Sequence, residues 1–437
     1  MRKVILALIA AAITLSLCAC RGGSTGGNDS QPGVTNNSTE KPAPSQTEDG
    51  ASAVWSNAEE PQPAGRLFES GAFVFLDLGD GTAYAMSYKG SGPEVVIPAE
   101  AGGLSVTGIW SYALTDAAGP VNKVTLPASI KKIAYSALTK IGLIQIEVDA
   151  ANPYLCSIDG ALYSKDGKTL ICYPADHCSF TGVRKFTLPD SVETIAAGAF
   201  WYDYTLMVVE VGNNNKAFKD VDGLVYSKDG KSVVWFPAGK PYTLYEIPDG
   251  VTIVAPNAFV CARNLGTITF PASVEKIAPN AFLDCTALKY LTVDENNKYY
   301  SSVDKKILYN KDKTELVFYP PSNSTTTFSF VDGMTKIRDY ACFGCKFMYN
   351  APVPEGVTEI GFDAFKYCDW LREVDLPVSL KTIGENAFAD CRDLTVINFA
   401  GTAAEWGKVE KGRFWNAGDT PEITVRCSDG EVVLPDA

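Results

Sequence analysis

The 437-residue chain has a single histidine, His177, and this shortage limits the enzyme classes to which it can belong. A Ser-His-Asp or Cys-His arrangement needs a histidine with defined catalytic partners, and the repeat pattern supplies no such partner for His177. The chain also lacks a glycine-rich phosphate loop, a Walker motif and a His-Glu-x-x-His motif. Carboxylates are abundant, but no pair stands out as the acid and base of a glycosidase. The sequence therefore predicts a protein that is not an enzyme and needs no cofactor or metal.

Basic clusters are also missing. No run of Lys or Arg is longer than two, and 38 basic residues face 51 acidic ones, for a formal net charge of −13. Nucleic acids and anionic lipid surfaces are bound through basic patches. We therefore expect no nucleic-acid partner, and membrane contact only through an anchor.

The chain lacks long apolar runs apart from residues 4–17, VILALIAAAITLSL, which follow a short basic start. This pattern is typical of a signal peptide, predicted over residues 1–19, rather than of a membrane span. The segment Leu17-Cys18-Ala19-Cys20 resembles a bacterial lipobox, which would place the lipid on Cys20. Cys18 fits less well, because Leu17 would take the small-residue position. Ordinary secretion is the alternative.

Residues 20–64 hold almost no large apolar side chain and are rich in Gly, Ser, Thr, Asn and Pro. Such a segment cannot bury enough surface to offset its chain entropy. After the lipidated cysteine we expect a disordered tether that lets the remaining chain stand away from the lipid.

What the sequence does contain is a repeat, present seven times between residues 124 and 399. Clear copies are 268–288, 354–371 and 374–394, the last reading VDLPVSLKTIGENAFADCRDL. Consecutive short copies lie 23 residues apart, whereas others are separated by about 60, which we interpret as inserts of about 37 residues. A short fixed period predicts a stacked solenoid with an extended binding surface.

The repeat columns describe the expected core. An alanine recurs ten residues after the proline marker, followed in most copies by a phenylalanine. In a solenoid each side chain packs on its equivalent in the next coil, so these columns should be buried. The expected core pairs include Ala199 and Phe200, Ala258 and Phe259, Ala281 and Phe282, Ala364 and Phe365, and Ala387 and Phe388.

Each copy predicts two short strands and one tight turn. The β-branched run before the proline alternates with a period of two, and the proline ends it because it has no N–H for the ladder. Val-x-x-Ile predicts a second strand, and the Asn-Ala-Phe segment predicts a single helical turn. The expected fold is a β-rich right-handed solenoid of the α/β type with short strands and single helical turns.

These repeats resemble the BspA-like branch of the leucine-rich repeat proteins, bacterial surface proteins whose repeats read L-x-x-V-x-L-P-x-S-V-x-x-I-G-x-x-A-F-x-x-C. The resemblance covers roughly residues 68–434, including an entry segment at 79–109 and a closing segment at 401–434. It implies an N-terminal β cap over 65–97, a leucine-rich-repeat solenoid over 98–399 and a C-terminal cap over 400–437. It also implies a lipid-anchored protein on the outside of a bacterial cell, with adhesion to host proteins or to other microbes.

Cysteine is abundant, with 12 residues, which in an exported protein suggests disulfides. Four of them, however, recur fourteen residues after the marker, where small polar groups face inward, and we expect these to be buried structural thiols. Cys172 and Cys178 are a better disulfide candidate, whereas a zinc site around His177 would match no common ligand spacing. The four expected structural thiols are Cys285, Cys345, Cys368 and Cys391.

The three inserts, near 150–180, 212–240 and 294–322, align with one another and each contains two β-runs around Lys-Asp-Gly-Lys or its variant. They predict β-hairpins that project from one side of the solenoid. Their recurring aromatics are expected to pack the hairpins against one another and against the solenoid. These residues are Tyr163, Tyr226 and Tyr309. The candidates for ligand contact are Trp201, Tyr202, Tyr204, Trp235 and Phe318.

Three functions remain open. The first is adhesion to an extracellular host or microbial protein. The second is capture of a polysaccharide or mucin glycan, and the third is a structural role in the cell envelope. Coplanar exposed aromatics would favour sugar, and a mixed polar and apolar face would favour protein.

Overall fold

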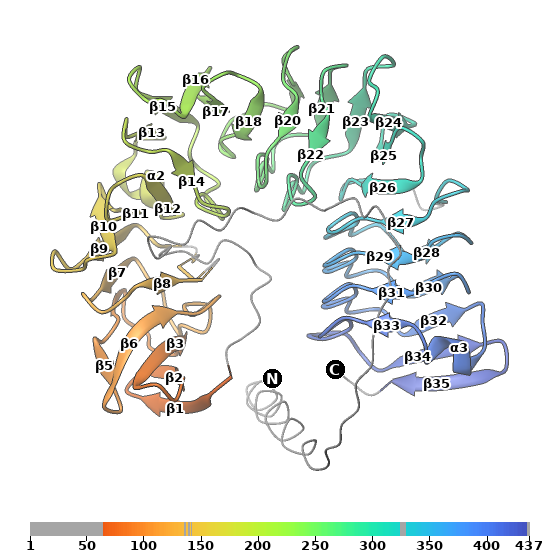
Figure 1. Ribbon diagram of the computed structural model, residues 1–437, viewed down its shortest axis with the longest axis horizontal. Helices are drawn as coiled ribbons and strands as arrows, with labels where there is room; N and C mark the ends of the chain where they lie inside the picture. Colours follow the sequence, from red (N-terminus) through yellow and green to blue (C-terminus); the bar gives the residue numbers. More distant parts are fainter. Residues whose placement is uncertain (1–63, 135–136, 139, 141, 324–328, 435–437) are drawn as a thin grey trace, which may run out of the picture. The chain divides into compact units, whose positions relative to one another are not determined.

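Two ladders of short parallel strands run through the part of the chain that the computed structural model describes, which is residues 64–434 without 135, 136, 139, 141 and 324–328. Most coils contribute one strand to each ladder (Figure 1). The predicted β-rich solenoid is confirmed. The strands of the first ladder are β4 (Glu94–Val96), β7 (Lys123–Leu126), β9 (Gln145–Val148), β13 (Lys185–Leu188), β15 (Val208–Val211), β19 (Leu244–Glu246), β21 (Thr267–Phe270), β23 (Tyr290–Val293), β28 (Asn350–Pro352), β30 (Glu373–Leu376), β32 (Val396–Phe399) and β34 (Ile423–Cys427).

The second ladder follows the proline corner. Its first strand, β6 (Leu104–Ile109), is long, and the regular coils then add strands of two residues. The remaining strands of this ladder are β8 (Lys132–Ile133), β12 (Thr169–Cys172), β14 (Thr194–Ile195), β18 (Ser232–Trp235), β20 (Ile253–Val254), β22 (Lys276–Ile277), β26 (Glu315–Phe318), β27 (Lys336–Ile337), β29 (Glu359–Ile360), β31 (Thr382–Ile383) and β33 (Glu410–Lys411).

The register of the ladders explains the sequence columns. In the β30–β32 pair, Val374 lies opposite Ile397 and Leu376 opposite Phe399, and all four side chains are buried. Glu373 and Asp375, which alternate with them, are only half-buried. Period-two alternation therefore places one row of each strand in the core and the other at the surface.

A third ladder is formed by the turn segments, the stretches around Ala-Phe-x-x-Cys in the regular coils. Alternate backbone N–H groups donate to the next turn segment, as in Phe259 N to Ala281 O at 2.9 Å and Phe365 N to Ala387 O at 2.7 Å. The phenylalanine rings stack within this ladder, with Phe365 and Phe388 at 5.0 Å and an interplanar angle of 4°. Close stacking of backbone leaves no room for a side chain larger than alanine.

The two β-runs around the Lys-Asp-Gly turn or its variant pair antiparallel, but the second run also belongs to the second ladder, so the prediction that the inserts project from the solenoid is wrong. Each is a complete coil, named here an insert coil, with a strand in each ladder and two extra strands between them. The extra pairs are antiparallel, and the second extra strand also pairs with the strand of the second ladder. The insert coils run over β9–β12 with β10 (Leu155–Ile158) and β11 (Ala161–Ser164), over β15–β18 with β16 (Phe218–Val221) and β17 (Leu224–Ser227), and over β23–β26 with β24 (Tyr300–Val303) and β25 (Ile307–Asn310).

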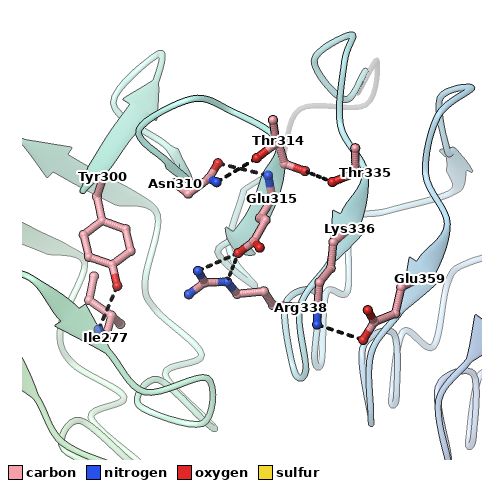
Figure 2. Close-up of polar contacts among 9 residues, drawn as sticks. All are labelled: Ile277, Tyr300, Asn310, Thr314, Glu315, Thr335, Lys336, Arg338 and Glu359. Atoms are coloured by element: carbon pink, nitrogen blue, oxygen red, sulfur yellow. Dashed lines mark hydrogen bonds and ion pairs between the residues drawn. The ribbon is translucent and has the colours of Figure 1, made fainter. Parts of the chain in front are cut away.

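The insert coils divide the second ladder into separate sheets. Between β22 and β26 no ladder bond is made in the described chain, because the extra strands occupy the edge of β26. Figure 2 shows how this junction is completed: the backbone N–H of Ile277 donates to the hydroxyl of Tyr300 at 3.0 Å. Beyond β26 the ladder resumes with β27, and ion pairs of 2.6 Å (Arg338 with Glu315) and 2.8 Å (Lys336 with Glu359) cross its strands.

Both ends of the described chain carry additional strands. At the start, β1 (Arg66–Ser70), β2 (Phe73–Asp77) and β3 (Thr82–Tyr88) form an antiparallel meander, and β3 continues in parallel with β6. At the end, β35 (Gly430–Leu434) pairs antiparallel with β34. Such strands cover edges that would otherwise be free to pair. The remaining elements are β5 (Glu100–Ala101), α2 (His177–Thr181) and α3 (Ala403–Trp406).

Candidate binding surfaces

Tyr204, one of the predicted ligand contacts, is engaged within the protein. Its hydroxyl donates to Asp284 Oδ2 at 3.1 Å and accepts from Arg263 Nη2 at 2.6 Å. The Arg263 guanidinium lies 3.7 Å from the centre of the tyrosine ring and forms an ion pair of 2.6 Å with Asp284. Burial raises the pKa of Tyr204, so the phenol stays protonated.

This bridge exists because of a missing turn segment. In the second insert coil the chain continues from β18 through Phe236 and Pro237. A single backbone hydrogen bond, from Phe236 N to Ala258 O, joins this stretch to the turn segment of the next coil. Tyr204 reaches across the second insert coil to Arg263 and Asp284, which belong to the two coils that follow it. The aromatic Trp-Tyr-Asp-Tyr departure from the repeat is therefore matched by partners 59 and 80 residues away.

Trp201 and Tyr202 lie beside this bridge and are half-buried. Their ring centres are 5.9 Å apart, and that of Tyr202 is 6.3 Å from the ring centre of Tyr204. Burial, followed by the nearby Tyr112, raises the pKa of Tyr202 to about 12. These two rings are partly accessible, as is that of Tyr204.

The prediction of ligand contact through exposed rings is wrong for Trp235 and Phe318, which are 3% and 2% exposed. Trp235 stacks on Phe200 at 3.9 Å, and Phe318 packs against Phe282 at 5.0 Å. Both rings occupy core positions beside the phenylalanine column, because the insert coils are wound into the stack.

An exposed aromatic group lies instead on the regular coils after the third insert. We call Phe347, Tyr349, Trp370 and Arg372 the aromatic patch. Trp370 and Tyr349 are 42% and 37% exposed, and their rings stack with centres 5.8 Å apart. Phe347 meets Trp370 edge-on, and the Arg372 guanidinium lies 5.8 Å from the Tyr349 ring. The patch combines aromatic area with a cation.

The repeated thiols are free and buried, and each faces a carbonyl oxygen of the preceding coil. Cys368 Sγ lies 3.1 Å from Cys342 O, and Cys391 Sγ lies 3.1 Å from Phe365 O. Cys285 and Cys345 make the same contact, at 2.9 and 3.5 Å. Burial holds the pKa of Cys285, Cys345 and Cys391 well above that of an ordinary thiol.

Cys172 and Cys178 are not bonded to each other, contrary to the disulfide prediction. The Cys178 Sγ faces the hydroxyl of Tyr173 at 3.3 Å, whereas Cys172 belongs to β12 and is buried. His177 Nδ1 lies 2.9 Å from the carbonyl oxygen of Ile144. Over residues 64–434, gaps apart, no group of three or more His, Cys, Asp or Glu side chains is placed to hold a metal ion.

Sequence reasoning missed two sets of buried polar residues. Asp203 occupies the cysteine column in its coil and is 0% exposed. One buried asparagine in each insert coil joins that coil to the one before. The signal for Asp203 was its position fourteen residues after Pro189, and the signal for the asparagines was their shared offset in the aligned inserts, Asn152, Asn215 and Asn297.

The family model for the BspA type leucine rich repeat region matches residues 240–326 and 314–425, with six copies. The repeats within these two segments belong to this family. The matched segments contain the turn ladder, the third insert coil and the aromatic patch. No curated protein matches the chain.

Solved structures to which the chain is similar come from several bacteria. A leucine rich cell surface protein from Faecalibacterium prausnitzii is 19% identical, with 81% of this chain and 99% of that one covered and a TM-score of 0.32. The pneumococcal vaccine antigen PcpA is 17% identical, with coverage of 84% and 89% and a TM-score of 0.33. A leucine-rich repeat protein from Eubacterium ventriosum is 17% identical, with coverage of 79% and 83% and a TM-score of 0.37.

Cys20 and the predicted signal peptide and tether lie outside the described residues. Within the described residues, no helix is long and apolar enough to cross a membrane.

Proposed function

We propose that the protein is a non-catalytic binding protein, exported and held at the bacterial cell envelope by a lipid on Cys20, that adheres to an extracellular protein through the aromatic patch. The observation that carries the proposal is the exposure of Trp370 and Tyr349 beside Arg372. Trp, Tyr and Arg are the residue types that most often dominate the energy of protein interfaces.

The geometry of the patch favours a protein over a sugar. Tyr349 and Trp370 stack on each other, and Phe347 meets Trp370 at 87°. Protein groups therefore occupy ring faces that a sugar platform would leave open, while the ring edges remain for a partner. The Arg372 guanidinium beside them is exposed and forms an ion pair of 3.6 Å with Asp393. Glycan capture is the alternative, and a purely structural role in the envelope is the second one.

The test is a binding panel of host matrix proteins beside a polysaccharide and mucin-glycan array. Saturable binding to a protein should weaken about 30-fold in Trp370→Ala, the loss of about 2 kcal/mol that is typical of a central aromatic contact. Tyr154→Ala removes a similarly exposed ring from the first insert coil and is the matched control. Glycan binding in place of protein binding would refute the proposal, and silence on both arrays would favour the structural role.

A further inference from the structure

A cavity of about 150 Å³ lies beside the second insert coil, and we call it the Trp235 cavity. Ala196 and Phe200 line it from the turn segment before this coil, and Ala255 and Asn257 line it from the turn segment after it. The cavity exists because the second insert coil has no turn segment of its own to fill the space.

Two buried hydrogen-bond donors belong to residues that line the cavity. Trp235 Nε1 and Asn257 Nδ2 have no hydrogen-bond partner among the described residues, and both residues are more than nine-tenths buried. The Asn257 Oδ1 already accepts from Asn280 Nδ2 at 3.3 Å, which leaves the amide N–H₂ free. A buried donor without an acceptor costs about 1–3 kcal/mol, so its retention calls for an explanation.

The tryptophan donor is peculiar to this coil. The equivalent positions of the other insert coils hold Cys172 and Phe318, which have no N–H in the side chain. Packing in this column therefore does not require an indole. The stacking of Trp235 on Phe200 needs only an aromatic ring, and the N–H is an addition to it.

The lining selects the chemistry of an occupant. It contains no charged side chain, and its only side-chain acceptor is the Asn257 Oδ1 that Asn280 occupies. A water or hydroxyl would accept from the donors but find no side-chain acceptor in the lining for its own hydrogen. A carbonyl oxygen has two lone pairs and no hydrogen, which matches two donors. The alanine and proline walls suit an attached methyl group.

The volume limits the size of this group. About 150 Å³ corresponds to about five water molecules at about 30 Å³ each. An acetamido group fits this space, whereas a whole pyranose ring with its substituents does not. Phe200, which lines the cavity, is followed directly in the chain by Trp201 and Tyr202, whose half-buried rings are amphipathic platforms of the kind that sugars contact.

We infer that the Trp235 cavity binds the acetamido group of an N-acetylated sugar. The carbonyl oxygen accepts from Trp235 Nε1 and Asn257 Nδ2, the methyl group contacts the alanine walls, and the sugar ring stays outside against Trp201 and Tyr202. This site is separate from the aromatic patch, so the inference does not depend on the proposed adhesion to a protein.

The experiment is saturation-transfer NMR on the purified full chain with N-acetylglucosamine, glucose and Nε-acetyl-lysine amide as probes. N-acetylglucosamine should bind with the strongest transfer to its acetyl methyl, and glucose should not bind. Trp235→Phe keeps the ring and removes the donor, so the dissociation constant for N-acetylglucosamine should rise about tenfold. Trp406→Phe makes the same change at another buried tryptophan, in the C-terminal cap, and should leave binding unchanged.

If Trp235→Phe does not fold, Asn257→Asp removes the second donor while it retains an acceptor for Asn280. Absence of transfer to the acetyl methyl would overturn the inference, as would an unchanged dissociation constant in the variants. Binding of Nε-acetyl-lysine amide alone would overturn the assignment to a sugar. Loss of protein binding in Trp370→Ala with N-acetylglucosamine binding retained would show that the two sites are distinct.

Discussion

At the scale of single residues, the cysteine column shows which properties the solenoid requires at an interior turn. Its thiols are small, buried and placed against a carbonyl oxygen of the coil before. Asp203 occupies the same position with different partners. Its Oδ1 accepts from the backbone N–H groups of Thr205 and Leu206 at 2.8 and 3.0 Å. Its Oδ2 has no hydrogen-bond partner among the described residues. The column therefore does not require sulfur as such.

Asp203 should make stability depend on pH. Burial raises its pKa from 3.8 to about 6, so the folded state favours the neutral carboxyl. The stability that it contributes is complete below about pH 4 and is lost as pH rises through about 6, a change of about 3 kcal/mol. Asp203→Asn should therefore match the wild type at about pH 3.5 and exceed it in free energy of unfolding at about pH 8. Urea unfolding at both pH values checks this.

The control for that experiment is Asp249→Asn, an exposed carboxylate on a regular coil. It should leave the difference between the two pH values unchanged. If Asp203→Asn behaves like this control, the carboxyl of Asp203 is ionised in the folded protein and the argument from burial fails.

Thiol reactivity should follow burial. Of the ten cysteines within the described residues, Cys156 and Cys427 are half-buried and the others are buried. The thiolate is the reactive form, and burial disfavours it. Alkylation of the native protein, followed by peptide mass mapping, should modify Cys156 and Cys427 first, and the remaining eight only after unfolding. Rapid native labelling of Cys368 or Cys391 would contradict the packing of the column.

At the scale of elements, the insert coils show how a regular stack accepts additional strands. Each buried asparagine bonds two carbonyl oxygens of the preceding coil and two N–H groups of its own. Asn297 Nδ2 donates to Pro271 O and Val274 O, both at 2.9 Å, and its Oδ1 accepts from Tyr299 N and Tyr300 N. Asn152 and Asn215 repeat this arrangement. The side chain thus fixes the chain where it turns from the first ladder into the extra strands.

Asn297→Ala should lower the free energy of unfolding by about 3 kcal/mol, because it leaves several buried backbone groups without partners. Its neighbour Asn296 is exposed, and Asn296→Ala should change the same quantity by less than about 0.5 kcal/mol. Urea unfolding monitored by circular dichroism compares the two. Equal effects would mean that water replaces the lost bonds at position 297.

The sequence predicted the features that recur with the repeat period and missed those that do not. The alanine and phenylalanine columns were readable because each is repeated at a fixed spacing, and the structure buries Ala258 and Phe259 as expected for a stack. The insert coils were misjudged because their first strand lacks the proline that marks a regular coil. The bridge from Tyr204 to Arg263 spans a coil without a turn segment, and no periodic signal connects such a pair.

At the scale of the whole described chain, the interior is not one uniform core. The buried apolar residues form four clusters, and the insert coils lie where one cluster meets the next. The ladders are interrupted at these same coils. In a repeat protein each coil contacts chiefly its neighbours, so stability is approximately a sum of local terms. Interrupted ladders should weaken the coupling between the blocks on either side.

Local unfolding should therefore stay within one block of coils, bounded by insert coils. Phe388→Ala removes a buried ring from the cluster that holds most of the buried apolar residues of 330–425 and should cost about 3–5 kcal/mol. We expect amide hydrogen exchange to accelerate throughout that block while β6, β8 and β12, which border another cluster, keep their protection. Phe259→Ala is the matched change in a central cluster and should move the loss of protection to residues 224–318. Uniform acceleration along the chain in both variants would mean that the insert coils transmit stability as well as the regular ones do, and that the solenoid unfolds as a single unit.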